Sequence, residues 1–288
     1  MNKEIWTVGR ILQWTEQYFQ SKEMYSPRLD GEVLLSHMLG KDRIYLYTHY
    51  DQPLIQSELD AYRALVLERA KGRSVASIIG MKEFMGLPFK VNEHVLIPRP
   101  DTETLVEHIL GTVSADASVR ILDVCSGPGT ILLSLLHYLP NATGIGLEIS
   151  PLAIDVACKN LNSLGLSDRA QFFESNMFSY IKGSTECFDI IVSNPPYITS
   201  EDMKTLSTEV LNEPHIALEG GADGLDFYRI LASESGAYCI SGGIIAMEVG
   251  INQHEAVGQL LIESGDFTHI QYAKDLSNIQ RVVIGSHI

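Results

Sequence analysis

The tetrapeptide Asn194-Pro195-Pro196-Tyr197 follows an apolar run and has the residue types needed to orient a planar amine. Proline has no backbone N–H, so two consecutive prolines stop a strand abruptly and leave its last carbonyls free. The side-chain oxygen of Asn194 and the carbonyl of Pro195 can then both accept hydrogen bonds from one NH₂ group, beside the flat ring of Tyr197. We interpret this turn as a substrate site and not only as the end of a strand.

A second chemical feature is the loop Cys125-Ser126-Gly127-Pro128-Gly129, which follows an apolar run and precedes a helical pattern. Its two glycines allow the backbone to approach a ligand closely, as in folds that bind nucleotides. A glycine pair after a strand is weak evidence on its own, because it also suits a tight turn.

Glu148 strengthens the interpretation of the glycine loop, because it stands at the end of the next predicted strand, 144–147. Nucleotide-binding folds place a carboxylate there to accept hydrogen bonds from ribose hydroxyls. A glycine loop with a ribose carboxylate fits either a nicotinamide dinucleotide or S-adenosylmethionine. Leu132 stands where the full Gly-x-Gly-x-x-Gly pattern has its third glycine, which disfavours a cofactor that carries a pyrophosphate.

The elements that must position these residues follow from the apolar pattern. From residue 120 onward, short apolar runs alternate with helical patterns, which predicts a largely parallel, helix-covered α/β sheet. Before it, apolar residues at three- and four-residue steps predict a small helical bundle over the first ~75 residues. Residues 78–98 read as a short hairpin that bridges two domains, and Asp101 is expected to cap the next helix. The candidate strands are 121–124, 144–147, 170–173, 190–192, 243–248, 269–272 and 282–284.

Composition and charge limit the function classes. The chain has 288 residues, 45% apolar and 20% charged, as in ordinary globular proteins. It lacks a secretory signal and an apolar run of the ~18 residues that a membrane span needs, so we expect a cytoplasmic protein. Four dispersed cysteines predict neither a disulfide framework nor a metal site. Residues 1–90 carry 12 basic and 11 acidic residues and the remainder 9 and 25, and this acidic second half weighs against a nucleic-acid substrate.

The motifs resemble those of one family. Asn-Pro-Pro-Tyr after an apolar strand is similar to the signature of methyltransferases that use S-adenosylmethionine to modify the planar amines of adenine, cytosine and glutamine. Further motifs resemble the HemK-type release-factor glutamine methyltransferases, in the same order over nearly the whole chain. These motifs are Ser26-Pro27-Arg28-Leu29-Asp30, Val95-Leu96-Ile97-Pro98-Arg99-Pro100-Asp101-Thr102-Glu103, Glu213-Pro214, Asp223-Gly224-Leu225, Glu248-Val249-Gly250 and Arg281-Val282-Val283.

The resemblance implies both architecture and activity. The expected fold is a Rossmann-like, seven-stranded S-adenosylmethionine methyltransferase domain (101–288), preceded by a helical substrate-recognition domain (1–77) and a β-hairpin linker (78–100). The implied reaction methylates the side-chain amide nitrogen of the glutamine in the GGQ motif of class I peptide-chain release factors, which supports translation termination. We expect a monomer that needs no metal and contacts neither nucleic acid nor a membrane directly.

The resemblance also implies roles for single residues. The loop from Cys125 to Gly129 would cradle the methionine end of the cofactor, Glu148 would bind its ribose, and Asn176 and Met177 would meet its adenine. Asn194 would contact the cofactor as well. The substrate glutamine would be held by Asn194, Pro195, Pro196 and Tyr197. The family usually has Gly at position 125, Asp at 148 and 176, and a large residue at 177.

The implied mechanism relies on positioning. Asn194, Pro195 and Tyr197 are the expected catalytic residues, because two acceptors beside a flat ring would hold the amide in line with the methyl–sulfur bond. No general base is required. Three alternatives remain: a glutamine methyltransferase of a ribosomal protein, an adenine amino-methyltransferase of DNA or RNA, and a cofactor-binding module without activity.

Overall fold

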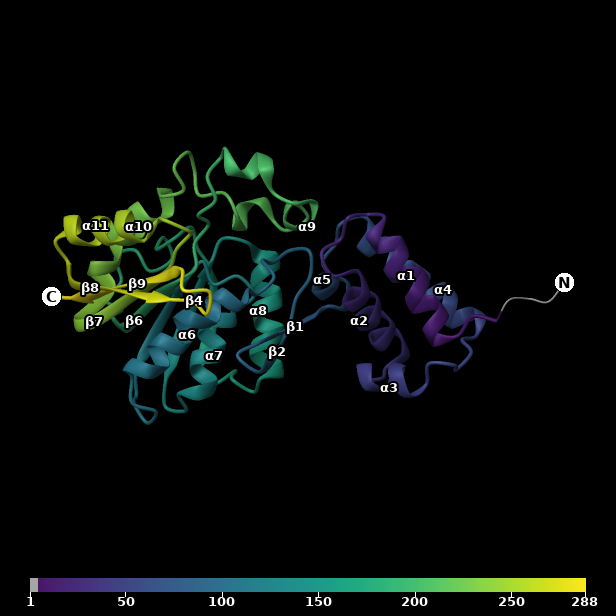
Figure 1. The fold of residues 1–288 in the computed structure, drawn as a ribbon. Coiled ribbons are helices and arrows are strands. Elements are labelled where there is room, and N and C mark those ends of the chain that lie inside the picture. Colours follow the sequence, from purple (N-terminus) through teal and green to yellow (C-terminus); the bar gives the residue numbers. More distant parts are fainter. Residues whose placement is uncertain (1–4) are drawn as a thin grey trace. The chain divides into compact units, whose positions relative to one another are not determined.

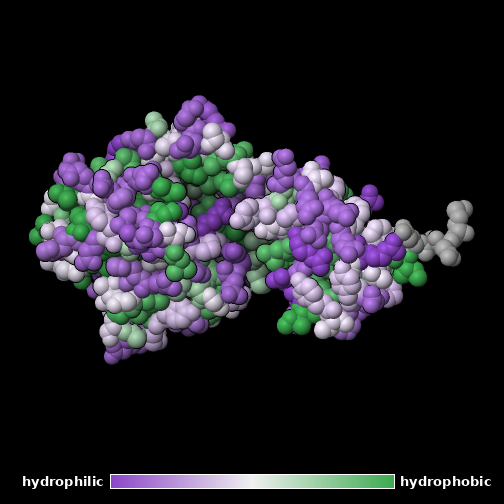
Figure 2. Space-filling model, viewed as in Figure 1, coloured by the Kyte–Doolittle hydropathy of each residue, from purple (hydrophilic) through white to green (hydrophobic). Residues whose placement is uncertain are grey.

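The computed structural model describes residues 5–288, which form two compact units (Figure 1). The first unit comprises residues 5–80 together with 208–212, and the second comprises 81–207 and 213–288. The first four residues of the domain predicted at 1–77 lie outside the described residues. On the face shown in Figure 2, hydrophilic and hydrophobic residues are interspersed over each unit, as on ordinary protein surfaces.

The first unit is the predicted helical bundle. Its helices are α1 (Val8–Gln20), α2 (Pro27–Leu39), α3 (Arg43–Thr48), α4 (Gln56–Ala70), α5 (Val75–Ile79) and the short α9 (Thr208–Leu211). The apolar faces of α1, α2 and α4 share one core, in which Phe19, Leu34 and Tyr62 are fully buried. The guanidinium of Arg69 lies 2.8 Å from a carboxylate oxygen of Asp30 and 2.8 Å from one of Glu209, which joins α9 to the bundle.

The second unit is built on a seven-stranded sheet in the order β5-β4-β3-β6-β7-β9-β8. Its strands are β3 (Arg120–Val124), β4 (Thr143–Glu148), β5 (Ala170–Glu174), β6 (Phe188–Ser193), β7 (Cys239–Glu248), β8 (Phe267–Lys274) and β9 (Gln280–His287). The first five are parallel, whereas β9 runs antiparallel to both β7 and β8. All seven predicted strands are therefore confirmed, as is the α/β fold class.

Helices cover both faces of this sheet. Successive side chains of a strand point to opposite faces, so Ile121 packs beneath α6 (Pro100–Thr112), α7 (Thr130–Tyr138) and α8 (Pro151–Ser163). Leu122, the next residue, faces α10 (Asp226–Glu234) and α11 (His254–Ser264). The strand order reverses between β3 and β6, and open α/β sheets bind ligands outside the carboxyl ends of the strands at such a switch point.

The segment before the sheet contains the predicted hairpin, β1 (Met81–Phe84) paired antiparallel with β2 (Leu87–Lys90). This hairpin groups with the second unit. The prediction that Asp101 caps the next helix is wrong. Helix α6 begins at Pro100, with Arg99 as the N-cap, because proline has a fixed φ that suits the first helical position and lacks the N–H that would otherwise be unpaired there. Among residues 5–288, no helix has the length and apolar character to cross a bilayer.

Candidate active site

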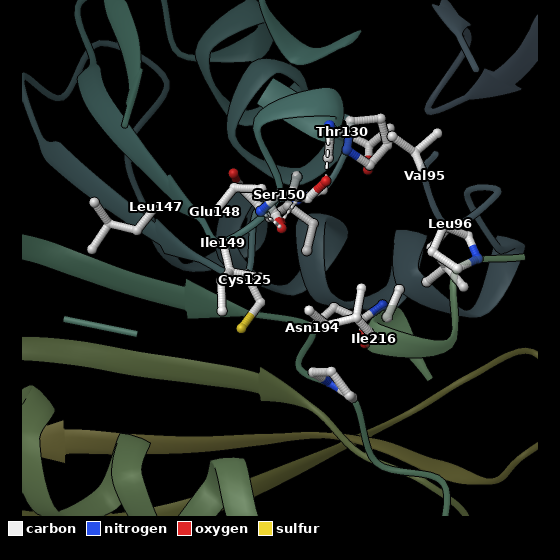
Figure 3. Close-up of a pocket in the computed structure, with 18 of the residues that line it drawn as sticks. Val95, Leu96, Cys125, Thr130, Leu147, Glu148, Ile149, Ser150, Asn194 and Ile216 are labelled. Carbon is white, nitrogen blue, oxygen red and sulfur yellow. Dashed lines mark hydrogen bonds between the residues drawn. The ribbon is translucent and has the colours of Figure 1, made fainter. Parts of the chain in front are cut away.

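A pocket of about 390 Å³ lies at the carboxyl ends of the parallel strands, at the switch point of the sheet. Its walls come from the residues after β3, β4, β5 and β6, and from two stretches around residues 94–99 and 214–217. In Figure 3, Glu148 and Ser150 gather at one side of this pocket, whereas Asn194 and Ile216 lie at the other. The motifs that lie far apart in the sequence therefore meet in one cavity.

The two glycines of the loop after β3 have different structural roles. Gly127 lines the pocket with φ +52°, and a Cβ there would meet nothing within 4 Å. Gly129 does not line the pocket, and a Cβ there would lie 2.7 Å from the ring of Phe172. Gly127 thus leaves space for a ligand, whereas Gly129 lets the start of α7 pack closely against the sheet.

The carboxylate of Glu148 joins the end of β4 to this glycine loop. Its Oε2 accepts a hydrogen bond from the backbone N–H of Gly127 at 2.8 Å, and its Oε1 accepts one from the N–H of Ser150 at 3.0 Å. Burial raises the pKa of this carboxyl, while the backbone N–H groups oppose that shift by stabilising the ionised form. The carboxylate is thus fixed at the pocket wall with lone pairs left for a hydroxyl-bearing ligand.

Cys125 occupies a backbone conformation that favours glycine. Its φ is +62°, and its Sγ lies 3.8 Å from the Sδ of Met177, whose φ is +50°. Both residues line the pocket, as do Asn176, Ser126 and Pro128. The positive φ gives a physical reason why a glycine suits position 125.

The Asn-Pro-Pro-Tyr turn presents alternate residues to the pocket. Asn194 and Pro196 line it, whereas Pro195 and Tyr197 are not among the described residues that do. The Nδ2 of Asn194 donates to the Oγ1 of Thr102 at 3.3 Å, so the carbonyl end of the amide remains for a ligand. The hydroxyl of Tyr197 donates to the Oε1 of Glu248 at 3.3 Å, which directs it away from this space.

Several lining residues were not assigned a role from the sequence. Leu96 and Arg99 come from the family motif at 95–103, and Ile216 lies two residues after the motif Glu213-Pro214. The guanidinium of Arg99 lies 2.6 Å from the Oε1 of Glu213, whose Oε2 accepts from the N–H of Ile97 at 3.1 Å. This pair ties the two walls together, and its signal in the sequence was only the presence of both charges in family motifs.

Comparisons with known proteins agree with this fold. Residues 10–80 match the family described as PrmC N-terminal domain, and residues 100–223 match the methyltransferase small domain. The solved hMettl16 catalytic domain, in complex with a MAT2A 3'UTR hairpin, has a TM-score of 0.56 and 15% identity, covering 82% of this chain and 84% of that one. Residues 100–223 therefore match a methyltransferase domain, and the solved structure shares the fold of the chain.

Full-length relatives identify the family. A release factor glutamine methyltransferase of Geobacter sulfurreducens is 43% identical over 98% of this chain and 97% of its own length. One from Rhodopirellula baltica is 36% identical over 98% of this chain and 97% of its own length. The chain belongs to the release factor glutamine methyltransferase family, which confirms the resemblance found in its motifs.

Proposed function

We propose that this protein transfers a methyl group from S-adenosylmethionine to the side-chain amide nitrogen of the GGQ glutamine in class I peptide-chain release factors. Family membership supports the reaction class, and one observation in the site carries the proposal: Asn194 lies in the pocket with its NH₂ end already bonded to Thr102. An acceptor oxygen that is free to bind a second NH₂ group is what a planar amide substrate requires.

The residues around the pocket fit the cofactor. We assign the methionine end to the loop from Cys125 to Gly129, where the open side of Gly127 admits a close ligand. We assign the ribose to the buried carboxylate of Glu148, and the adenine to the wall formed by Asn176 and Met177. When bound, the sulfonium of S-adenosylmethionine supplies an already activated methyl group.

The catalytic task of the protein then concerns the nucleophile. An amide nitrogen is a poor nucleophile because its lone pair is delocalised into the carbonyl. In our proposal the Oδ1 of Asn194 and the carbonyl of Pro195 accept from the substrate NH₂, which aligns it and favours the positive charge that develops on nitrogen. Positioning of this kind lowers a barrier by roughly 7–11 kcal/mol in favourable cases. Pro196 and the ring of Tyr197 complete the proposed substrate site.

No side-chain base is needed in this scheme. The methylated amide cation is strongly acidic and loses its proton without assistance. Asn194, Pro195 and Tyr197 therefore act by orientation and charge stabilisation, and the reaction requires no titrating catalytic histidine or lysine. A bound metal is not required for an activated methyl donor either.

We further propose that the helical unit recognises the protein substrate. None of its described residues, 5–80 and 208–212, lines the pocket, and the family match over residues 10–80 shows that relatives also carry this region. The excess of acidic residues after residue 90 supports a protein partner over nucleic acid. In this proposal a single copy of the chain acts in the cytoplasm, where translation factors are found.

The test compares substrates directly. Purified protein and S-adenosylmethionine are incubated in parallel with a class I release factor, with ribosomal proteins and with DNA, and methyl incorporation is measured in each. The proposal expects incorporation into the release factor alone. Preferred incorporation into a ribosomal protein would favour a ribosomal-protein methyltransferase, and preferred incorporation into DNA would favour an adenine methyltransferase. No incorporation into any substrate would favour a cofactor-binding module without activity.

A further inference from the structure

The side-chain amide of Asn160, in α8, bonds the backbone of the glycine loop and the backbone at the end of the hairpin. We propose that Asn160 is a positioning residue that holds the glycine loop and the segment 91–99 at one fixed separation. The inference rests on the proposed function, because it concerns the loop assigned to the cofactor. Asn160 is not among the described residues that line the pocket, so it acts through the backbones that it bonds.

Two bonds of Asn160 go to the end of the hairpin, which lies beside α8 (Figure 1). Its Oδ1 accepts from the backbone N–H of Lys90 at 2.7 Å, and its Nδ2 donates to the carbonyl of Lys90 at 3.1 Å. A residue of a neighbouring antiparallel strand would bond Lys90 through the same pair of groups. The amide thus anchors the last residue of β2, and the segment that carries the pocket residues from His94 to Arg99 begins directly after it.

The third bond of Asn160 goes to the glycine loop. Its Nδ2 also donates to the carbonyl of Pro128 at 2.9 Å. In a regular helix the N–H of Leu132, four residues further on, would bond this carbonyl. Here that N–H donates to the Oδ2 of Asp123 at 3.2 Å. The carbonyl of Pro128 is therefore held by a side chain of α8.

This position requires a side chain that both accepts and donates. Asn160 is 0% exposed, and its Oδ1 and Nδ2 are both bonded, as a buried amide must be to avoid a large desolvation cost. Asparagine is also a weak helix former, so neither helix propensity nor apolar packing accounts for it inside α8. Aspartate could accept from the N–H of Lys90 but could not donate to either carbonyl, and leucine could do neither.

The bonds predict that the cofactor loop and the hairpin respond together. The loop is fixed by Glu148 from β4 and by Asn160 from α8. A cofactor that binds only the fixed loop stabilises every bond that depends on it, including the one donated by Lys90. Leu96 and Glu148 lie on opposite sides of the pocket in Figure 3, so without Asn160 the distance between these two walls should no longer be fixed.

Variants of the full chain test the effect on cofactor binding. Asn160→Asp keeps the acceptor for Lys90 and removes both donors, whereas Asn160→Leu removes all three bonds at similar volume. Leu161→Ala, the buried next residue of α8, weakens the packing of the same helix and leaves the amide intact. By calorimetry, we expect the affinity for S-adenosylmethionine to fall about tenfold in both Asn160 variants and to stay within about twofold in Leu161→Ala.

The value of kcat at saturating S-adenosylmethionine is a readout that a loss of stability does not move while the protein stays folded. With a release factor as substrate, we expect Asn160→Asp to lower kcat about tenfold to hundredfold, as misplacement of a pocket wall does, and Leu161→Ala to keep it. Wild-type affinity and kcat in folded Asn160→Asp would overturn the inference. Equal losses in Leu161→Ala would also overturn it, because destabilisation of α8 alone would then explain them.

A measurement on the wild type needs neither a variant nor a release factor. Lys90 does not line the pocket, and the hydrogen exchange of its backbone N–H is followed by NMR. We expect this exchange to slow at least about tenfold with S-adenosylmethionine at about 100 times its Kd. If it slows while no release factor is methylated, the proposed function fails and the positioning role stands. If it is unchanged while methylation proceeds, the inference fails alone.

Discussion

The backbone N–H of Gly127, in the loop after β3, donates to the Oε2 of Glu148, the last residue of β4, at 2.8 Å. This bond makes the glycine loop after β3 and the acidic end of β4 one rigid wall of the pocket. In our account the same wall receives both the methionine end and the ribose of the cofactor. A change at either residue should therefore affect cofactor binding before it affects chemistry.

Cofactor affinity is the first quantity to measure. Gly127→Val places a β-branched side chain at φ +52° in the open space of the loop, so we expect S-adenosylmethionine binding to be lost. Glu148→Gln removes the charge from the hydrogen bonds and should cost about 1.5–3 kcal/mol of binding energy. Calorimetry measures both, with Gly111→Ala, an open helical position, as the control for folding. Wild-type affinity in both folded variants would contradict the assignment.

Variants of Asn194 test whether this residue orients the substrate amide. Asn194→Ala removes the acceptor that matters most as the nitrogen gains charge, so the loss should appear mainly in kcat. By analogy with single oxyanion-hole donors, we expect about 2.7–4 kcal/mol, or a 100- to 1000-fold loss in rate. Asn194→Asp keeps an acceptor oxygen but replaces the donor to Thr102, and should retain part of the activity. Steady-state methylation checks this, and near-normal kcat in Asn194→Ala would refute the mechanism.

Two variants of Tyr197 distinguish the role of its ring from the role of its hydroxyl. Tyr197→Phe removes the bond to Glu248 but keeps the aromatic face, whereas Tyr197→Ala removes both. If the ring carries the contact with the substrate, the loss of kcat in Tyr197→Phe should be the smaller one. Equal losses in the two variants would assign the role to the hydroxyl instead.

The backbone conformation of Cys125 leads to a prediction about stability. The left-handed conformation at φ +62° costs a residue with a Cβ about 1–2 kcal/mol, and glycine avoids this cost. Cys125→Gly should therefore leave the free energy of unfolding unchanged or raise it, despite the larger entropy of unfolded glycine. Cys158→Gly, inside α8, is the matched control and should destabilise by about 1 kcal/mol. Urea unfolding of the two variants provides the comparison. A clear loss of stability in Cys125→Gly would mean that its contact with Met177 outweighs the backbone strain.

The burial of Asp123 leads to a prediction about how stability depends on pH. Complete burial raises the pKa of this carboxyl to about 8, although the N–H of Leu132 stabilises the ionised form. The folded state thus holds a proton that the unfolded state releases near pH 4, so stability should be lost as pH rises from ~4 to ~8. The slope is about 1.4 kcal/mol per pH unit. Asp123→Asn mimics the neutral form and should be less pH-dependent in chemical unfolding. Identical slopes in the two proteins would show that Asp123 does not titrate in this range.

The strands and the main site segments could be predicted because their signals are local. A buried parallel strand appears as a short apolar run, and the loops that carry chemistry directly follow such runs at 125–129, 148 and 194–197. Helices α3, α5 and α9 were missed, since four to six residues are too few to show a helical period.

The bond between Asn194 and Thr102 could not be predicted for a different reason. Thr102 stands in α6 and Asn194 follows β6, and they meet only because α6 packs on the face of the sheet that contains β6. Nor does the sequence reveal which of the 36 acidic residues accepts from the hydroxyl of Tyr197. Likewise, the alternation that points Asn194 and Pro196 into the pocket and Tyr197 toward Glu248 depends on backbone direction after the strand.

The most direct test of the account is the mass of a release factor after incubation with the protein and S-adenosylmethionine, located by fragmentation. The account predicts a gain of one methyl group on the side-chain amide of the GGQ glutamine. It predicts almost no gain with Asn194→Ala at matched cofactor occupancy. A methyl group found on any other residue, or equal methylation by the wild type and Asn194→Ala, would contradict it.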